Sequence, residues 1–353
     1  MRKIKKTKIV ATLGPASSSR KTIKAMMESG VNVFRINFSH ADHKDVLVRI
    51  EIIRELNVSL GYHVAILADL QGPKLRVGKM TEGTVVKDGQ EVQFTTDKVE
   101  LGTANAIYMN YKRFPQDVTP GERILLDDGK LIFEIVETDK KARVKARVIQ
   151  GGELKSKKGV NLPNTNISLP ALTEKDVEDA IFAIKQDVDW IALSFVRHKQ
   201  DVEDLRKLIQ EHGKYDIPII SKIEKPEALA NIKEIVKASN ALMVARGDLG
   251  VEVAAEEVPI VQKELVQHAK LARIPVIVAT QMMESMIDGL TPTRAEVNDV
   301  ANSVMDGADA VMLSGETSVG KYPVEVIQTM RRIVVSVETV SYTHLTLPTS
   351  HVV

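Results

Sequence analysis

Two short apolar runs in this 353-residue chain each stop at ionisable side chains. The runs are residues 219–223 and 241–245, and a helix-like pattern over 226–237 separates them. Each contributes a cation and a carboxylate at its end: Lys222 with Glu224, and Arg246 with Asp248. Parallel α/β folds bind ligands at the carboxyl ends of their strands. Two carboxylates and a lysine at this position favour a hard divalent cation and an anionic substrate.

Other apolar runs end in polar residues of the same kinds. In chain order these are Arg35, Asn37, Ser39 and His40; Asp69, Lys74 and Arg76; Thr280 and Gln281; and Ser314 and Glu316. A barrel would bring all of these strand ends to one rim. Several cations facing several carboxylates suit a phosphorylated, multiply anionic substrate that is held through a metal ion.

Purely structural roles remain open for these charges. Arg35 lies in an apolar run, where arginine needs a partner, and an ion pair with Asp69 would satisfy it. Lys222 and Arg246 could likewise hold the carboxylates of Glu224 and Asp248 in salt bridges. Metal binding is favoured because neighbouring strands supply both acids, and because Gly247 lets a ligand approach the backbone closely.

The elements that must position these residues follow a regular rhythm. We expect strands near residues 7–13, 31–40, 63–70, 190–196, 219–223, 241–245, 274–280 and 309–314. A helical pattern follows each of them except the third, where short alternating runs and turn signals indicate an all-β segment. The predicted fold is α/β, a (β/α)₈ TIM barrel with a small all-β domain inserted after strand 3. An open doubly wound sheet is the alternative.

The predicted boundaries divide the chain into four parts. They are a first barrel part at 1–72, an inserted β-barrel cap domain at 73–170, a second barrel part at 171–340, and a disordered or non-native tail at 341–353. Asp42 and Gly61 are expected to bound one long helix, and Thr173 with Asp176 to cap another.

The composition excludes several classes of function. A net charge of +1 favours neither nucleic acid nor an anionic membrane surface. The chain has no cysteine, so disulfides and thiolate metal sites are excluded, and no apolar run approaches the length of a membrane span. We therefore expect a cytoplasmic protein.

Seven motifs in the right order resemble the pyruvate kinase family. They are Ala-Thr-Leu-Gly-Pro at 11–15, Phe-Arg-Ile-Asn-Phe-Ser-His at 34–40, Lys-Lys-Gly-Val-Asn-Leu-Pro at 157–163, Ser-Lys-Ile-Glu at 221–224, Ala-Arg-Gly-Asp-Leu-Gly at 245–250, Ala-Thr-Gln-Met at 279–282 and Met-Leu-Ser-Gly-Glu-Thr at 312–317. The resemblance runs from Thr7 to about Val340. It implies phosphoryl transfer from phosphoenolpyruvate to ADP, giving ATP and an enolate that is protonated to pyruvate.

The resemblance also implies a role for each site residue. Glu224 and Asp248 would hold Mg²⁺ or Mn²⁺, and Lys222 and Arg35 would bind the phosphoryl group. The N–H groups of Gly247 and Asp248 would receive the substrate carboxylate, and Thr280 would lie where the enolate is protonated. The nucleotide, with a second Mg²⁺ on its phosphates, would meet Asn37, Phe38, Ser39, His40, Arg76 and Lys158.

Two departures from the family pattern carry expectations of their own. Many members have Thr-Lys and then Glu where this chain has Leu70, Gln71 and Lys74, and those members require K⁺. Here the ammonium of Lys74 would replace K⁺ in a site lined by Asn37, Ser39, Asp69 and Leu70, so we expect K⁺ not to be required. Members also continue into a C-terminal domain, which we expect to be missing here, and this puts the family's homotetramer in doubt.

Two other functions remain open from the sequence. One is a Mg²⁺-dependent aldolase or lyase that acts on pyruvate or an enolate, on a related barrel. The other is a catalytically inactive truncated fragment that only associates with partners.

Overall fold

The computed structural model describes residues 5–39, 41–163, 165–213 and 216–345. The chain forms two compact units. The first contains Met1–Gly72, Leu172–Gly247 and Pro259–Val353, and the second contains Pro73–Ala171 and Asp248–Val258.

Eight parallel strands of the described chain close into a barrel in the first unit, which confirms the predicted fold class. Around the barrel they are β1 (Lys8–Thr12), β16 (Ala310–Leu313), β15 (Val276–Ala279), β14 (Ala241–Ala245), β13 (Ile219–Ile223), β12 (Trp190–Leu193), β3 (Ala65–Asp69) and β2 (Val33–Asn37). Buried side chains from most of these strands, such as Val10, Leu67, Ala192 and Met243, pack into one apolar cluster. The barrel is therefore a packed core, and its chemistry must lie at the strand ends.

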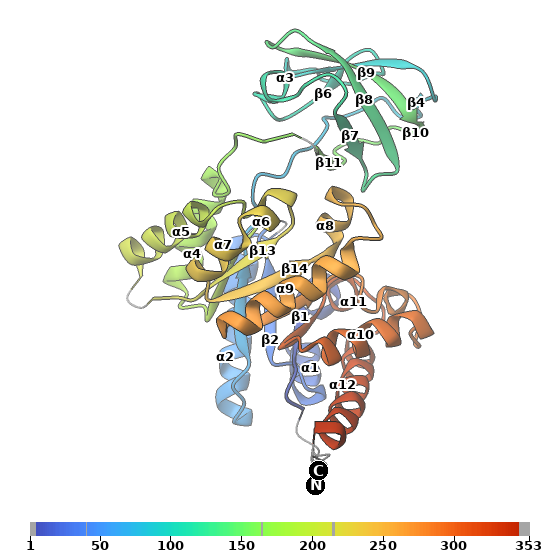
Figure 1. The fold of residues 1–353 in the computed structure, drawn as a ribbon. Helices are drawn as coiled ribbons and strands as arrows, with labels where there is room; N and C mark the ends of the chain where they lie inside the picture. The colour runs from blue at the N-terminus through green and yellow to red at the C-terminus, as the bar shows by residue number, and fades with distance from the viewer. Residues whose placement is uncertain (1–4, 40, 164, 214–215, 346–353) are drawn as a thin grey trace, which may run out of the picture. The chain divides into compact units, whose positions relative to one another are not determined.

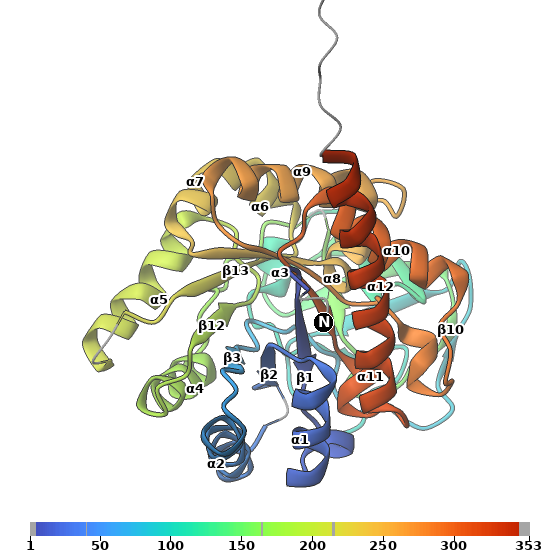
Figure 2. The same ribbon diagram turned by 90° about the horizontal axis from the view of Figure 1, so that it is seen from below.

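Helices surround these strands, as Figure 2 shows. They are α1 (Arg20–Ser29), α2 (His43–Leu60), α4 (Glu174–Lys185), α5 (Lys199–His212), α6 (Pro226–Ala230), α7 (Ile232–Ala238), α9 (Val258–Ala272), α10 (Arg294–Asp306) and α12 (Pro323–Leu345). Shorter helical turns are η1 (Pro15–Ser17), η2 (Glu284–Ile287) and α11 (Gly315–Ser318).

Local sequence signals set several of these helix ends. The side chain of Asp42 accepts a hydrogen bond from the Lys44 N–H, and Gly61 ends α2 in the left-handed conformation that glycine adopts without strain. Thr173 and Asp176 form a reciprocal capping box at the start of α4. Both helix boundaries agree with the sequence prediction.

The second unit is built mainly of short strands. They are β4 (Val85–Val86), β5 (Glu91–Thr95), β6 (Ile107–Tyr108), β7 (Arg123–Leu126), β8 (Leu131–Thr138), β9 (Arg143–Gln150), β10 (Gly152–Glu153) and β11 (Val160–Asn161), with the short helices α3 (Phe114–Asp117) and α8 (Arg246–Glu252). Strands β11, β7, β8, β9, β5 and β6 form one sheet over a core that includes Phe94, Phe114 and Phe133. Figure 1 labels the elements of both units.

The structure differs from the sequence prediction in local details. The helix expected over 226–237 is split at Asn231 into α6 and α7. A helix that was not expected, α8, begins directly after β14. Helix α12 continues to Leu345, inside the segment 341–353 that was expected to be disordered, because Pro348 is the first helix breaker after Pro323. Residues 346–353 lie outside the described residues.

Candidate active site

Four charged side chains meet at the carboxyl ends of three barrel strands. Arg35 Nε on β2 lies 2.6 Å from Asp69 Oδ2 at the end of β3. Lys222 Nζ on β13 lies 3.2 Å from Asp69 Oδ1 and 3.0 Å from Glu224 Oε1. The sequence-predicted residues Arg35, Asp69, Lys222 and Glu224 therefore form one continuous group, which we call the charged cluster.

Burial strengthens the electrostatic interactions among the side chains of the charged cluster. Asp69 and Glu224 are 1% and 0% exposed, and Lys222 is 9% exposed. Burial alone would raise the pKa of Asp69, but the positive charges of Lys222 and Arg35 outweigh it and hold the pKa below its usual value. Asp69 is therefore a permanent anion that keeps both cations in place.

The ion pairs that the sequence left open as purely structural roles account for part of this geometry. The Arg35–Asp69 and Lys222–Glu224 pairs both exist. Arg246 does not pair with Asp248; its guanidinium lies 2.7 Å from Asp299 Oδ1 and donates to the carbonyl of Thr280 at 2.6 Å. Arg246 is thus a structural support for the site, bonded to Asp299 and to the backbone of Thr280.

Three residues that the sequence reasoning missed complete the charged cluster. Ser194 Oγ accepts a hydrogen bond from Lys222 Nζ at 2.7 Å, and the Phe195 N–H donates to Glu224 Oε2 at 2.8 Å. Thr12 Oγ1 accepts from Arg35 Nη1 at 3.0 Å. Ser194 and Phe195 directly follow β12, but a serine after a strand is a weak signal, and Phe195 acts through its backbone N–H. The φ of Phe195 is 54°, a conformation that non-glycine residues adopt mainly where it serves a purpose.

Thr280 and Gly247 form a second group at neighbouring strand ends. The N–H of Gly247, in the first turn of α8, donates to Thr280 Oγ1 at 2.7 Å, and that hydroxyl donates to the carbonyl of Ala279 at 2.6 Å. Thr280 has a φ of 71°, which is strained for a β-branched residue. Asp248, next to Gly247, is half-buried.

The end of β2 carries the first part of the predicted nucleotide site. Asn37 Oδ1 accepts from the Ser39 N–H at 3.1 Å, and the Phe38 N–H donates to the carbonyl of Asp69 at 3.0 Å. The Phe38 ring is buried, so only its backbone can face a ligand. His40 lies outside the described residues.

The remaining strand ends hold acceptors that are already occupied. The carbonyl of Leu70 accepts from Ser194 Oγ at 2.7 Å. The carboxylate of Glu316 accepts from the N–H groups of Met283 and Ser314, while burial raises its pKa. Gln281, like Thr280, has a positive φ.

The second unit contains the other predicted nucleotide residues. Lys158 Nζ lies 2.8 Å from Asp127 Oδ1, and hydrogen bonding to Lys158 lowers the pKa of Asp127. Arg76 Nη1 donates to the carbonyl of Lys157 at 3.1 Å. Lys74, the predicted K⁺ substitute, is half-buried, and its carbonyl accepts from Asn110.

The donor chemistry fits a hard divalent cation. Within the described ranges, no group of three or more His, Asp or Glu side chains is arranged to hold a metal by itself. Magnesium needs no such group, because proteins often hold it with one or two carboxylates and leave its other positions to water and substrate oxygens. The buried carboxylate of Glu224 is a donor of the type that this ion prefers.

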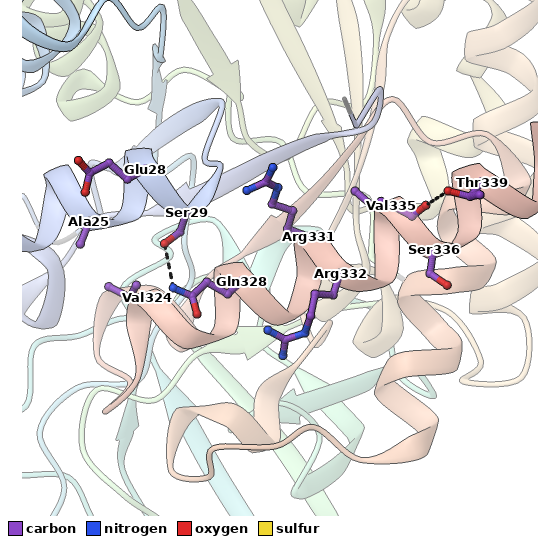
Figure 3. Close-up of a pocket in the computed structure, with 10 residues that line it drawn as sticks. All are labelled: Ala25, Glu28, Ser29, Val324, Gln328, Arg331, Arg332, Val335, Ser336 and Thr339. Atoms are coloured by element: carbon purple, nitrogen blue, oxygen red, sulfur yellow. Dashed lines mark hydrogen bonds between the residues drawn. The ribbon is translucent and has the colours of Figure 1, made fainter. Parts of the chain in front are cut away.

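A cavity of about 840 Å³ lies between α1 and α12, away from these strand ends (Figure 3). Its lining includes Ser29, Gln328, Arg331 and Arg332, and Gln328 donates to Ser29 Oγ at 3.3 Å. Ser29 ends α1 just before β2 begins, so the cavity lies towards the amino ends of the strands. It contains none of the predicted site residues. Across the described ranges, no helix is long and apolar enough to cross a membrane.

A closed parallel barrel with buried charges at the carboxyl ends of its strands defines the class of (β/α)₈-barrel enzymes. The family model "pyruvate kinase, barrel domain" matches residues 4–327. The chain belongs to the pyruvate kinase family, which confirms the resemblance inferred from its motifs.

Similar proteins agree on the family. A protein named pyruvate kinase from Corynebacterium glutamicum is 52% identical over 336 residues, which are 95% of this chain and 70% of that protein. One from Mycobacterium tuberculosis is 49% identical over 334 residues, covering 94% of this chain and 70% of that protein. One from Geobacillus stearothermophilus is 48% identical over 336 residues, covering 95% of this chain and 57% of that protein.

Proposed function

We propose that this chain transfers the phosphoryl group of phosphoenolpyruvate to ADP, giving pyruvate and ATP, the last step of glycolysis. Membership in the family supports the reaction. The single structural observation that carries it is the charged cluster, in which Arg35 and Lys222 are held side by side on Asp69. We expect the protein to act in the cytoplasm.

Arg35 and Lys222 are proposed to bind the phosphoryl group. A guanidinium offers two parallel N–H donors to phosphate oxygens, and an ammonium is a compact charge that can follow a moving group. When the P–O bond to the enolate oxygen breaks, its electron pair stays on the enolate, and Lys222 stabilises the charge on the phosphoryl group in transfer.

The start of α8 is proposed to bind the substrate carboxylate. The N–H groups of Gly247 and Asp248 lie in the first turn of this helix, where backbone donors favour anions. The Gly247 N–H now donates to Thr280 Oγ1, and a carboxylate would replace that hydroxyl as acceptor. Thr280 would lie where the enolate carbon is protonated, directly or through a water molecule, and its hydroxyl would exchange the hydrogen bond that it donates to the carbonyl of Ala279 for this role.

Glu224 and Asp248 are proposed to hold the divalent cation, Mg²⁺ or Mn²⁺. When bound, this ion supplies positive charge to the phosphoryl and carboxylate oxygens of the substrate. The protein's own part is to supply two carboxylates that follow neighbouring strands, since β13 pairs with β14 through Ile223 and Val244.

The nucleotide is proposed to bind six residues that the family resemblance implies. They are Asn37, Phe38 (through its backbone), Ser39 and His40 after β2, and Arg76 and Lys158 in the second unit. For Lys158, the phosphates of ADP would have to compete with the carboxylate of Asp127.

We also propose activity without K⁺. The ammonium of Lys74 would replace the ion in a site of Asn37, Ser39, Asp69 and Leu70. The test compares pyruvate formation in Tris, Na⁺ and K⁺ buffers of equal ionic strength. We expect K⁺ to change the rate less than about twofold. A large stimulation by K⁺ would contradict this proposal and leave the main reaction untouched.

The main reaction is tested by coupling pyruvate release to lactate dehydrogenase, with phosphoenolpyruvate, Mg²⁺ and ADP present. We expect turnover that requires ADP, and loss of about three orders of magnitude in Lys222→Met, since a preorganised donor of this kind typically contributes 10²–10³-fold. Lys207→Met, an exposed lysine on α5, is the matched control.

The alternatives predict different results in the same assay. Pyruvate release without ADP would indicate an aldolase or lyase. A well-folded chain with no turnover, and only association on size-exclusion chromatography, would indicate an inactive fragment.

A further inference from the structure

One face of α4 contacts both the end of β2 and the start of α2. Lys175 Nζ donates to the carbonyl of Phe38 at 2.9 Å and is paired with the carboxylate of Asp179. The other oxygen of Asp179 lies 2.7 Å from Nε2 of His43, the first residue of α2. Asp179 is 3% exposed, so its carboxylate is a buried link between the two side chains.

An aromatic group reinforces these polar contacts. The ring of Phe182 stacks on His43 with centroids 4.2 Å apart and an interplanar angle of 12°. Phe38 packs edge-on against both rings, at 6.1 and 6.2 Å. Such pairs stabilise beyond their buried area, so Phe38 is held by its ring as well as by its carbonyl.

The spacing on α4 explains how one helix makes all of these contacts. Lys175, Asp179 and Phe182 are at positions i, i+4 and i+7, which lie on one face of a helix. Helix α4 follows the inserted segment, so these contacts join parts of the chain that are 136 and 137 residues apart. Figure 2 shows α4 beside α2.

We propose that Lys175 and Asp179 are positioning residues that hold the end of β2 in the geometry required for nucleotide binding. This inference rests on the proposed function, in which Asn37, Phe38 and Ser39 contact the nucleotide. Phe38 lies between Asn37 and Ser39, so the hold on its carbonyl fixes the direction of both neighbours. Neither Lys175 nor Asp179 needs to touch the nucleotide.

Three variants and one control test this proposal. Lys175→Met removes the donor to Phe38, Asp179→Asn removes the buried charge, and Lys175→Arg keeps a cationic donor. Lys185→Met, an exposed lysine at the far end of α4, is the matched control. The dissociation constant of ADP is measured by calorimetry in the presence of Mg²⁺, which requires no turnover. Backbone hydrogen exchange is measured by mass spectrometry.

We expect Lys175→Met and Asp179→Asn to weaken ADP binding by about 5- to 30-fold, the factor for one or two lost charge-assisted hydrogen bonds. Peptides that cover the end of β2 and the start of α2 should exchange faster, while peptides from β1 and β16 should not change. Lys175→Arg should recover most of the affinity. Where turnover is measured, the KM for phosphoenolpyruvate should change less than about twofold, because Arg35 and Lys222 are held by Asp69 and Ser194, neither of which is on α4.

Other results overturn the proposal. Unchanged exchange in both variants would show that α4 does not hold this segment. Faster exchange with unchanged ADP affinity would show that the segment does not position nucleotide. If the variants bound both ADP and phosphoenolpyruvate more weakly and also lost thermal stability, the cause would be general unfolding. A parent chain that binds ADP without forming pyruvate would contradict the proposed reaction, while the ADP affinities of the variants would still decide this inference.

Discussion

Removing the ammonium of Lys222 should destabilise the barrel in a pH-dependent way. In Lys222→Met, Asp69 and Glu224 each lose a positive charge that lies 3.2 and 3.0 Å away. Arg35 still lies 2.6 Å from Asp69, so that carboxylate keeps one counter-ion. Glu224 keeps the N–H of Phe195. The substitution therefore leaves two buried carboxylates with less positive charge around them.

The magnitude follows from the burial of the charged cluster. Removing one partner of a buried ion pair typically costs about 3–5 kcal/mol. Because Arg35 remains, we expect the lower end, about 3 kcal/mol at pH 7. Burial, which raises the pKa of Asp69, would then be opposed by Arg35 alone.

The sign of the pH dependence follows from this change. In the parent chain the pKa of Asp69 is lowered, so its stabilisation is present above about pH 3.9 and is lost as the pH falls through the lower folded value. In the variant the pKa rises relative to the parent, so the folded variant takes up a proton at a higher pH than the folded parent does. The deficit of Lys222→Met should therefore be fully present at pH 7 to 8 and should shrink at acidic pH.

Urea unfolding followed by tryptophan fluorescence can measure this deficit. The chain has one tryptophan, Trp190, in β12, which pairs with the strand that carries Lys222. The control Lys207→Met breaks an exposed pair and should stay within about 0.5 kcal/mol of the parent. A deficit below about 1 kcal/mol at pH 7, or one that does not shrink as the pH is lowered into the acidic range, would refute the electrostatic reasoning.

Substitutions at three further positions test other parts of the site. Burial raises the pKa of Glu316, so the parent should lose stability as the pH rises through that value, whereas Glu316→Gln should not; urea midpoints at pH 5 and 8 check this. Thr280→Ser keeps the acceptor for Gly247 and should match the parent in thermal stability and turnover, whereas Thr280→Ala should lose about 1 kcal/mol and slow turnover. Asp299→Asn removes the counter-ion of the buried Arg246 and should cost about 1–3 kcal/mol in urea unfolding.

The sequence was sufficient to predict the barrel, because its signals are local and repeated. Apolar runs of strand length alternate with capped helical segments, and the cap of Asp42 and the box of Thr173 lie where their residue types predict. The split at Asn231 was missed because the apolar period continues through it. Helix α8 was not predicted because its sequence is short, contains glycine and shows no helical periodicity of apolar residues.

The same rule found most of the charged cluster and left open the Arg35–Asp69 and Lys222–Glu224 pairs, but it did not predict the contact of Lys222 with Asp69. Arg35, Asp69, Lys222 and Glu224 stand out because charge is rare in apolar runs. Ser194 does not stand out, since a serine after a strand usually signals a turn, and the donor in Phe195 is a backbone N–H that any residue carries. Which cation pairs with which acid depends on the register between β3, β12 and β13, and local sequence does not encode register.

The ion pairs of Asp69 with Arg35 and Lys222 matter because the proposed phosphoryl group would bind the same two cations. Asp69 holds Arg35 and Lys222 on its two oxygens, so the two cations are oriented before a ligand arrives. On the proposed function, a phosphoryl group would share these cations with Asp69 and would not have to order two flexible side chains, which lowers the entropic cost of binding. Asp69→Asn should therefore weaken binding of phosphoenolpyruvate even though Asp69 is not among the residues proposed to contact the substrate. If Asp69 served only to neutralise charge in the core, the same substitution would lower stability and leave the KM for phosphoenolpyruvate unchanged.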